Sequence, residues 1–387
     1  MKFNEKLFKK TFALIAFLWM SVYSFGQYDS IPHDGYDRTY LVHLPTAYDG
    51  STDLPLVIAM HGGFGNAFNL EDQSQLSVKA DLENFIVVYP EGVEGGILNI
   101  SSWNAGWCCG YSSNNNIDDV GFIDSLLNTL ISQYAIDTNR VYATGMSNGG
   151  FMSYRLACEL SDRIAAIAPV SASMSMPICN ATRAMPIIHF HSKLDLNVPY
   201  QGGVGNGLSS HYNSPIDSVL NVWSEHNNCP NNIDTVVNNS QYLHTKRSNC
   251  ECGSSVQYYL TEDGGHSWHG GNQTAIGDPV SNYINATDLM WDFFQEHTLD
   301  CNVVSVSNNR IEEVGISLFP NPTKEVFSIN IENNYQSLEV SIYTVMGQQV
   351  MSYQNQKEIN ISALAKGIYN VFVNIDGNLK VERIIKE

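Results

Sequence analysis

The chain has 387 residues, 43% of them hydrophobic, and a formal net charge of -19 at pH 7. This length exceeds one ordinary domain and the apolar content is enough for a buried core, so we expect one large domain and one small one. The acidic excess lies between residues 27 and 301. It argues against nucleic acid and anionic membrane surfaces as partners, because like charges repel, although solubility alone would also explain it.

The first 26 residues have the pattern of an export signal. Four lysines precede an apolar run over residues 11–20, and Ser24 and Gly26 place small side chains at a cleavage site before Gln27. We therefore predict a signal peptide over residues 1–26 that is removed from the mature protein. An uncleaved membrane anchor is the alternative, but the apolar run is short for a membrane span.

Strand and helix patterns alternate over residues 27–301, which we expect to form the large domain. A period-2 stretch within residues 36–48 predicts an early edge strand. Apolar runs predict further strands at 54–60, 85–89, 140–144, 164–170, 186–190 and 256–261, and helical patterns occur at 119–133, 149–159, 214–226 and 283–297. This order is typical of an α/β domain in which helices cover both faces of a mostly parallel sheet.

The composition changes outside these elements. Residues 202–213 are rich in Gly, and residues 227–255 are rich in Asn, Ser, Thr and Cys, so we predict two loops near the rim of the site. After a polar linker at 302–310, residues 311–387 carry short alternating stretches separated by Gly and Asn turns. They predict a separate small β-sandwich with strands at 326–331, 338–343 and 369–373.

The segment Gly145-Met146-Ser147-Asn148-Gly149-Gly150 lies between a predicted strand and a predicted helix. A G-x-S-x-G sequence alone is a weak signal, because chance matches occur. The strand-turn-helix context is the one that a nucleophile elbow requires, with the serine on a sharp and exposed turn. We therefore predict that Ser147 is a nucleophile.

A serine nucleophile needs a neighbouring base and a carboxylate that orients the base. His266, within a Gly-Gly-His-Ser-Trp segment, and Asp195, within a Leu-Asp-Leu-Asn-Val-Pro-Tyr segment, can fill these roles. Each residue alone is commonplace in loops. Together they follow the chain order of α/β-hydrolases, serine then aspartate then histidine, so we predict a catalytic triad of Ser147, Asp195 and His266.

Acyl transfer also needs backbone N–H groups that stabilise the oxyanion of the tetrahedral intermediate. We predict the N–H of Asn148 as one donor. The second is expected from the loop that begins with His61-Gly62-Gly63, through the N–H of Gly63 or, alternatively, of Phe64. A plain tight turn is the other interpretation of this loop.

Trp103, Trp107 and Trp268 lie close to the motifs in the sequence. We predict that they line an acyl or aromatic pocket, and packing in the core is the alternative, because large aromatic side chains serve both purposes. The chain carries no nucleotide-binding or metalloprotease motif, so no nucleotide, cofactor or metal is predicted.

Eight cysteines lie in the large domain or at its edge. In an exported protein we expect disulfides. Zinc is the alternative, but the two closely spaced pairs lack the spacing of metal fingers. The sequence does not fix the connectivity, and our pairing prediction is Cys229 with Cys250 or Cys252, and Cys108 or Cys109 with Cys158.

Seven segments in order carry a family resemblance over residues 30–297: 37–40, 61–63, 103–110, 118–123, 145–150, 195–200 and 264–268. They resemble the secreted polyhydroxybutyrate depolymerase and feruloyl esterase group, often placed with carbohydrate esterase family 1. This resemblance implies an α/β-hydrolase fold and a cofactor-free esterase with Ser147, Asp195 and His266 as its triad. Trp107 stands where the group usually has Gly, and His269 where it usually has Pro; both border the expected pocket and bear on acyl preference.

A second resemblance concerns the tail, in segments 318–322, 343–348 and 364–369. Residues 311–387 look like the C-terminal sorting domain of type IX secretion. That resemblance implies the type IX machinery as a partner and export through the periplasm across the outer membrane, often with removal of the tail. A substrate-binding module is the alternative interpretation of a small β-domain.

These patterns together predict a secreted or cell-surface serine carboxylic-ester hydrolase. We expect it to cleave feruloyl or acetyl esters on plant polysaccharide, because aromatic residues are plentiful near the motifs and no added polyester-binding domain is evident. Cleavage of poly(3-hydroxybutyrate) or oligoesters is the alternative within the same fold, since pocket loops decide the substrate. A surface binding protein that has lost activity is an alternative of another class, which the intact triad disfavours.

Overall fold

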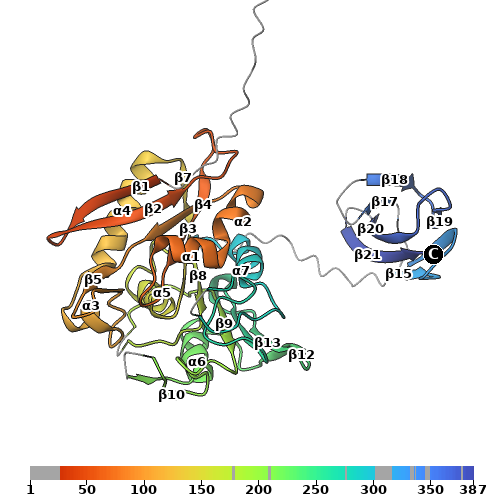
Figure 1. Ribbon diagram of the computed structural model, residues 1–387. Helices are drawn as coiled ribbons and strands as arrows, with labels where there is room; N and C mark the ends of the chain where they lie inside the picture. The colour runs from red at the N-terminus through yellow and green to blue at the C-terminus, as the bar shows by residue number, and fades with distance from the viewer. Residues whose placement is uncertain are drawn as a thin grey trace, which may run out of the picture. The chain divides into compact units, whose positions relative to one another are not determined.

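The computed structural model describes residues 27–176, 179–207, 211–274, 277–300, 316–331, 335, 337–344, 349–375 and 378–387. The predicted signal peptide at 1–26 and linker at 302–310 lie outside these residues. The chain divides into two compact units between residues 303 and 304, both drawn in Figure 1.

A ten-stranded sheet forms the centre of the larger unit, with the strand order β1-β2-β4-β3-β7-β8-β9-β14-β13-β12 (Figure 1). The six strands from β4 to β14 run parallel, and antiparallel pairs extend the sheet at both ends. This arrangement confirms the predicted α/β class. The strands are β1 Gln27–His33, β2 Tyr36–His43, β3 Leu54–Met60, β4 Ile86–Pro90, β7 Ile136–Met146, β8 Ala166–Val170, β9 Ile187–Ser192, β12 Asp234–Asn238, β13 Tyr242–Arg247 and β14 Val256–Thr261.

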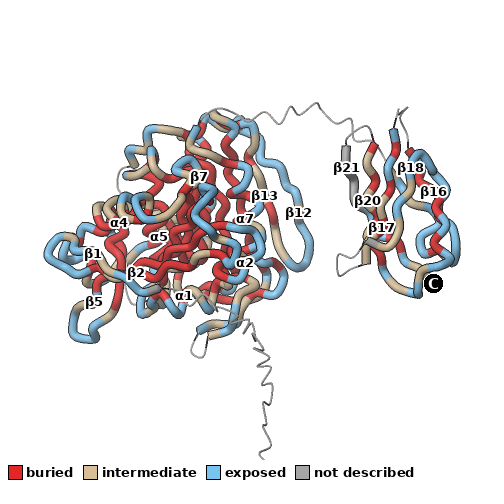
Figure 2. The backbone as a smooth tube through the Cα atoms, turned by 90° about the horizontal axis from the view of Figure 1, so that it is seen from above, coloured by how far each residue is buried: buried red, intermediate tan, exposed pale blue. Residues whose placement is uncertain are grey.

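Helices cover both faces of this sheet. One core cluster joins the sheet to α4, α5 and α6, and a second cluster joins it to α1, α2 and α7. Strand β3 contributes to both, because Leu56 and Ile58 enter the first cluster while Val57 and Ala59 enter the second. Buried residues accordingly concentrate along the central strands (Figure 2). The helices are α1 Ala67–Ser74, α2 Leu76–Glu83, α3 Gly110–Asn114, α4 Asp119–Gln133, α5 Asn148–Glu159, α6 Ile216–His226 and α7 Ala286–Gln295.

The prediction that the strand within residues 36–48 lies at the edge of the sheet is wrong. Strand β1 pairs with the outer edge of β2 and is itself the edge strand. The two strands are joined by a two-residue turn, Asp34-Gly35, in which both residues have positive φ. An Asp-Gly pair is a strong hairpin signal, because such turns require this left-handed backbone.

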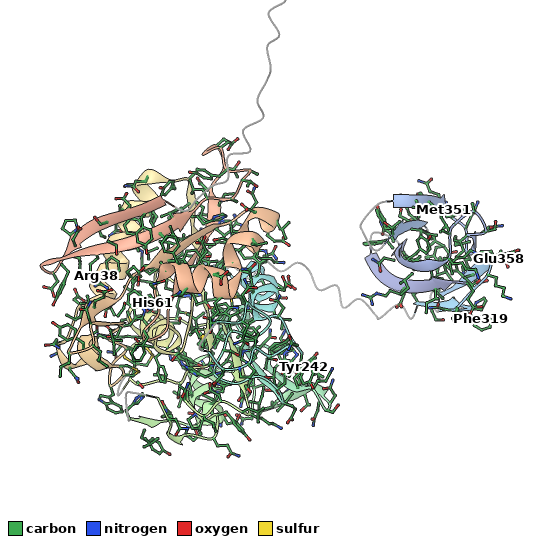
Figure 3. All side chains as sticks on the ribbon, viewed as in Figure 1. Arg38, His61, Tyr242, Phe319, Met351 and Glu358 are labelled. Atoms are coloured by element: carbon green, nitrogen blue, oxygen red, sulfur yellow. A yellow bond between two sulfur atoms is a disulfide. The ribbon has the colours of Figure 1, made fainter. Side chains whose placement is uncertain are left out.

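The two predicted loops differ in their outcome. Residues 202–213 contain only the short strands β10 Gly203–Val204 and β11 Tyr212–Asn213 among the described residues. Residues 227–255 were expected to be a loop near the site, but they contain β12 and β13. Strand β12 pairs with β13, and β13 pairs with β14. Tyr242, labelled in Figure 3, starts β13 at this end of the sheet.

The smaller unit consists of two antiparallel sheets, as the tail pattern predicts. One has the order β15-β16-β19 and the other β18-β17-β20-β21. Phe327 of β16 shares a core with Val340 of β17 and Val371 of β20, so the sheets pack face to face. The strands are β15 Ile316–Phe319, β16 Val326–Ile331, β17 Leu338–Thr344, β18 Gln349–Gln354, β19 Glu358–Asn360, β20 Gly367–Ile375 and β21 Asn378–Lys386.

Disulfides join Cys158 to Cys179, Cys229 to Cys250, and Cys108 to Cys109, and Cys252 is also disulfide-bonded. The predicted pairing of Cys229 with Cys250 is confirmed. Pairing of Cys108 or Cys109 with Cys158 is wrong. The Asn148 side chain at the start of α5 contacts Cys108 Sγ, whereas Cys158 lies about 15 Å further along the same helix.

Among the described residues, none of the helices combines the length and apolar character needed to cross a membrane.

Candidate active site

Ser147 lies on the sharp turn between β7 and α5. Its backbone has a φ of 53° and a ψ of -123°, a conformation that L-residues rarely adopt. Close packing enforces the turn, because a Cβ on Gly149 would overlap the carbonyl oxygen of Met60 on β3. The turn therefore places Ser147 at the carboxyl end of the central strands and at the N-terminus of α5, as expected for a nucleophile elbow.

Asp195 follows strand β9, which is separated from β7 by β8 in the sheet, and is 1% exposed. Its Oδ1 accepts hydrogen bonds from the N–H groups of Asn197 (2.9 Å) and Val198 (2.8 Å), and its Oδ2 lies 2.8 Å from His266 Nδ1. Burial favours the protonated carboxyl, but the contacts with His266 and the backbone donors outweigh it and lower the pKa of Asp195. The carboxylate is thus held ionised and in one orientation.

His266 lies in the segment after β14, whose backbone is held by a hydrogen bond from His266 N–H to Asp278 Oδ2 (2.8 Å). Because Nδ1 donates to Asp195, Nε2 is the acceptor in the neutral ring. His266 and Ser147 line the same cavity. The structure thus brings the three predicted triad residues together from the ends of β7, β9 and β14.

This cavity has a volume of about 750 Å³ and a largely apolar lining. Besides Ser147 and His266 it is lined by apolar side chains, by the Cys108–Cys109 disulfide and by part of the 202–213 segment. Ile97 and Leu98, between the short strands β5 Val93–Gly95 and β6 Ile100–Ser102, are also largely exposed and form part of its rim. The apolar side chains of the lining are those of Phe64, Ile97, Leu98, Ile100, Tyr111, Phe151 and Val198.

The residues predicted to supply the oxyanion donors line this cavity. Asn148 is the first residue of α5, where backbone N–H groups have no partner within the helix. Its side chain forms two hydrogen bonds with the backbone of Trp103: Oδ1 accepts from Trp103 N–H (2.7 Å) and Nδ2 donates to Trp103 O (3.0 Å). Gly63 also lines the cavity. The N–H of Phe64 donates to Ser101 O (3.3 Å), which favours Gly63 as the second donor.

His61 holds the loop that carries Gly63. Its ring is fully buried, with Nδ1 donating to Gly62 O (2.7 Å) and Nε2 accepting from Gly92 N–H (3.0 Å). Burial lowers the pKa of His61, so the ring stays neutral and this donor pattern is fixed. His61 is therefore a structural residue of the loop.

The three predicted pocket tryptophans do not line the cavity. Trp103 is fully buried and donates from Nε1 to His61 O (3.0 Å), and Trp268 is fully buried and donates to Thr287 Oγ1 (2.9 Å). Trp107 is 68% exposed. His269, expected to border the pocket, is fully buried outside the lining. Phe64, Tyr111 and Phe151 supply the aromatic lining instead.

Arg38 and Asp119 form a buried ion pair next to the site, and the sequence analysis did not predict this role. Arg38 Nη2 lies 2.6 Å from Asp119 Oδ1, with both side chains buried, and Asp119 Oδ2 accepts from Asn104 N–H (2.7 Å). Asn104 follows Trp103, so this ion pair anchors the segment that clasps Asn148. Arg38, on β2, and His61 are labelled in Figure 3. The sequence signal that could have indicated this ion pair was an arginine within a predicted strand and an aspartate at the start of a predicted helix.

Cys108, Cys109 and His211 place potential metal-ligand atoms within 4.8 Å of one another. The two cysteines are joined to each other and so present no thiolate to a metal.

Comparison with known proteins supports both predicted resemblances. Residues 38–201 match the sequence model of the family described as "Esterase PHB depolymerase", and residues 317–387 match "Secretion system C-terminal sorting domain". These matches confirm the resemblance to the polyhydroxybutyrate depolymerase and feruloyl esterase group, and the resemblance of the tail to a sorting domain. The tail match indicates export to the cell surface or the medium.

Several curated proteins are similar to the large unit. "Feruloyl esterase B" of Piromyces equi is 29% identical over 274 residues, 68% of this chain and 46% of that protein. "Bifunctional acetylxylan esterase/xylanase XynS20E" of Neocallimastix patriciarum is 25% identical over 69% of this chain and 35% of its own length. "Feruloyl esterase C" of Emericella nidulans is 26% identical over 66% of this chain and 83% of its own. The chain thus spans less than half of the first two relatives.

Among solved structures, "Acetyl xylan esterase from Aspergillus awamori" is 15% identical, with a TM-score of 0.48, over 70% of this chain and 100% of that one. "Crystal Structure of a Thermostable Esterase" is 17% identical, with a TM-score of 0.47, over 71% of this chain and 63% of that one.

Proposed function

We propose that this protein is an exported serine carboxylic-ester hydrolase. The observation that carries the proposal is the grouping of Ser147 and His266 in one cavity, with His266 Nδ1 held 2.8 Å from the Asp195 carboxylate. A serine on a strained turn, a histidine and an orienting carboxylate are the parts that acyl transfer requires.

In the proposed reaction, Ser147 Oγ attacks the ester carbonyl while His266 Nε2 takes the hydroxyl proton. The resulting oxyanion accepts hydrogen bonds from the N–H groups of Asn148 and Gly63. His266 then gives the proton to the leaving alcohol, and the acyl group stays on Ser147. A water molecule, deprotonated by His266, then attacks the acyl carbon. The bond to Ser147 Oγ breaks, His266 returns the proton to this oxygen, and the carboxylic acid leaves. Asp195 stabilises the imidazolium that forms in both steps.

The cavity favours a feruloyl-type acyl group over an acetyl group. Its volume of about 750 Å³ lies within the range of sites that enclose drug-sized ligands, far more than an acetyl group fills. Phe64, Tyr111 and Phe151 can contact an aromatic ring. The names of the curated relatives include feruloyl and acetylxylan esterases, which supports an ester on plant polysaccharide as the substrate.

A short polyester is the second candidate. The family match over residues 38–201 carries the description of a polyhydroxybutyrate depolymerase, and the exposed Ile97 and Leu98 at the rim can contact an aliphatic chain. The tail is proposed to direct the protein from the periplasm across the outer membrane through type IX machinery, and a substrate-binding module remains the alternative for it.

The test is hydrolysis by the mature chain of methyl ferulate, acetylated xylan and a suspension of poly(3-hydroxybutyrate), with the Ser147→Ala variant as the matched control. We expect the highest kcat/KM on methyl ferulate and none of these activities in the variant. Preference for the polyester would select the second candidate. Binding without turnover on any ester would support a non-catalytic surface protein and contradict the proposed activity.

A further inference from the structure

A line of buried hydrogen bonds runs behind Asp195, away from the cavity. Tyr154 Oη on α5 lies 2.9 Å from His189 Nδ1, and His189 Nε2 lies 3.1 Å from His191 Nδ1. His191 Nε2 in turn lies 2.7 Å from Val198 O and 3.5 Å from Asp195 Oδ2. All three side chains of this line, Tyr154, His189 and His191, are fully buried. The esterase mechanism above uses none of them.

The hydrogens along this line have only one consistent direction when the rings are neutral. Val198 O can only accept, so His191 Nε2 carries a hydrogen and its Nδ1 is an acceptor. His189 must then donate from Nε2, which leaves its Nδ1 to accept the hydroxyl hydrogen of Tyr154. The last donor, His191 Nε2–H, faces both Val198 O and the Oδ2 atom of Asp195 that binds His266.

The surroundings keep both rings neutral. Burial is the main cause that lowers the pKa of His189 and of His191, and the nearby imidazoles of His269 and His266 act in the same direction. Asp195 is the charged group that opposes this shift at His191. At the other end, burial raises the pKa of Tyr154, so its hydroxyl keeps its hydrogen. The ring of Tyr258 on β14 packs edge-on against His189.

We propose that His191 is a positioning residue for the triad carboxylate. Its Nε2–H, fixed in this tautomer by His189 and Tyr154, holds the 195–198 turn and the Oδ2 atom of Asp195 in line with His266. The line also ties α5, which carries the elbow, to β9, which carries the acid. This role rests on the proposed esterase activity, and it predicts a loss in kcat with little change in KM.

The first test does not depend on turnover. In the mature protein labelled with 15N-histidine, NMR should show His189 and His191 as neutral rings with the hydrogen on Nε2 from pH 7 to 8. The His266 Nδ1–H proton should be found far downfield because of its bond to Asp195. A hydrogen on His191 Nδ1, or titration of His191 in this range, would overturn the proposal even if the protein hydrolysed no ester.

The second test uses two substitutions of the same residue. His191→Gln keeps an N–H near the position of Nε2, whereas His191→Leu keeps the bulk and removes the donor. His191→Leu leaves Val198 O without its buried donor and removes the N–H that lies 3.5 Å from Asp195 Oδ2, so kcat should fall about 10- to 100-fold. His191→Gln should stay within about threefold of the wild type. KM should change less than about twofold in both, because neither side chain lines the cavity.

His297→Leu is the matched control, because His297 is also a buried histidine but lies at the C-terminal end of α7, outside this line. It should leave kcat unchanged. Equal losses in the Gln and Leu variants, or a full kcat in His191→Leu, would overturn the role of the donor.

If His191→Leu does not fold, Tyr154→Phe tests the same line from its far end. It removes one hydroxyl and keeps the ring, so the protein should still fold and kcat should fall about two- to tenfold. An unchanged kcat in Tyr154→Phe would show that the line does not act on Asp195.

Discussion

Arg38→Met tests whether the buried Arg38–Asp119 ion pair, which does not line the cavity, affects stability and activity. Arg38 and Asp119 are 3% and 0% exposed as side chains and lie 2.6 Å apart. The guanidinium also packs over the ring of Phe122, 3.9 Å from its centroid, and donates to Glu91 O. Methionine keeps much of this packing and removes the charge, so Asp119 is left as a buried carboxylate without its partner.

The expected loss of folding free energy is about 3–5 kcal/mol, the cost of breaking a buried ion pair by removing one partner. For a unit of this size that loss corresponds to a fall in melting temperature of roughly 10 °C or more. Activity should also fall, because Asp119 holds Asn104 N–H, and the neighbouring Trp103 clasps the Asn148 side chain. The effect should be on kcat, since no residue of this support lines the cavity.

The assay is thermal unfolding together with ester kinetics for Arg38→Met, Asp119→Leu and the double variant. Replacing both partners by apolar residues removes the uncompensated charge, so the double variant should be more stable than Arg38→Met. A melting temperature for Arg38→Met within 2 °C of the wild type, or a double variant that loses the sum of both singles, would refute the reasoning.

Four further predictions follow from the same geometry. Ser147→Ala should lower kcat on soluble esters by about 10⁴-fold or more with an unchanged melting temperature; a variant that keeps a tenth of the activity contradicts the assigned nucleophile. Burial lowers the pKa of His269 to about 4, so the unfolded chain binds a proton at this site that the folded protein excludes, and stability should fall as the pH drops from about 6.5 towards 4. Melting temperatures of His269→Leu should depend less on pH in this window, and an equal dependence would count against the assignment. Reductant should lower the melting temperature, because the Cys158–Cys179 and Cys229–Cys250 bridges each join residues 21 positions apart and contribute about 3 kcal/mol; free thiols at all eight cysteines in the denatured, unreduced protein would exclude this. A chain without residues 311–387 should keep its activity on soluble esters and, in the native host, accumulate in the periplasm; normal export of this truncated chain would contradict the sorting role, and a selective loss on insoluble substrate would favour a binding module.

The central strands and helices were predictable because their signals are local. The helix at Asp119–Gln133 and the strands at Leu54–Met60 and Val256–Thr261 have the predicted bounds. In each, the spacing of apolar residues matches one backbone period over the whole element. The elbow was predictable for a related reason, since Ser147 stands between two such elements and glycines flank it.

Among the outer strands, β1, β12 and β13 were not predicted, because they are polar and gain order mainly from pairing with a neighbour. Strand β12 is largely exposed, and β13 is ordered between β12 and β14. Composition alone describes such segments as loops. Only the Asp34-Gly35 turn gave a local hairpin signal, and it lies at the opposite end of the sheet.

The tryptophans illustrate a different limit. Closeness in sequence to a motif was the basis for assigning Trp103 and Trp268 to the pocket, but side-chain direction depends on tertiary packing. The Nε1 group of each reaches a buried acceptor on another segment, His61 O and Thr287 Oγ1. A buried indole needs such a partner, so these two rings point into the protein and away from the cavity.

The contacts that align the site join residues far apart in the chain, which is why no motif reveals them. Arg38 meets Asp119 across 81 positions, and Asp195 meets His266 across 71. The Arg38–Asp119 pair holds the Asn104 segment next to the proposed oxyanion donor Asn148, and the Tyr154–His189–His191 line ends beside the proposed acid Asp195. None of the side chains in either group lines the cavity. Substitutions in either support should therefore change the rate of the chemical step, whereas substitutions at the rim, such as at Ile97, should change which ester is bound.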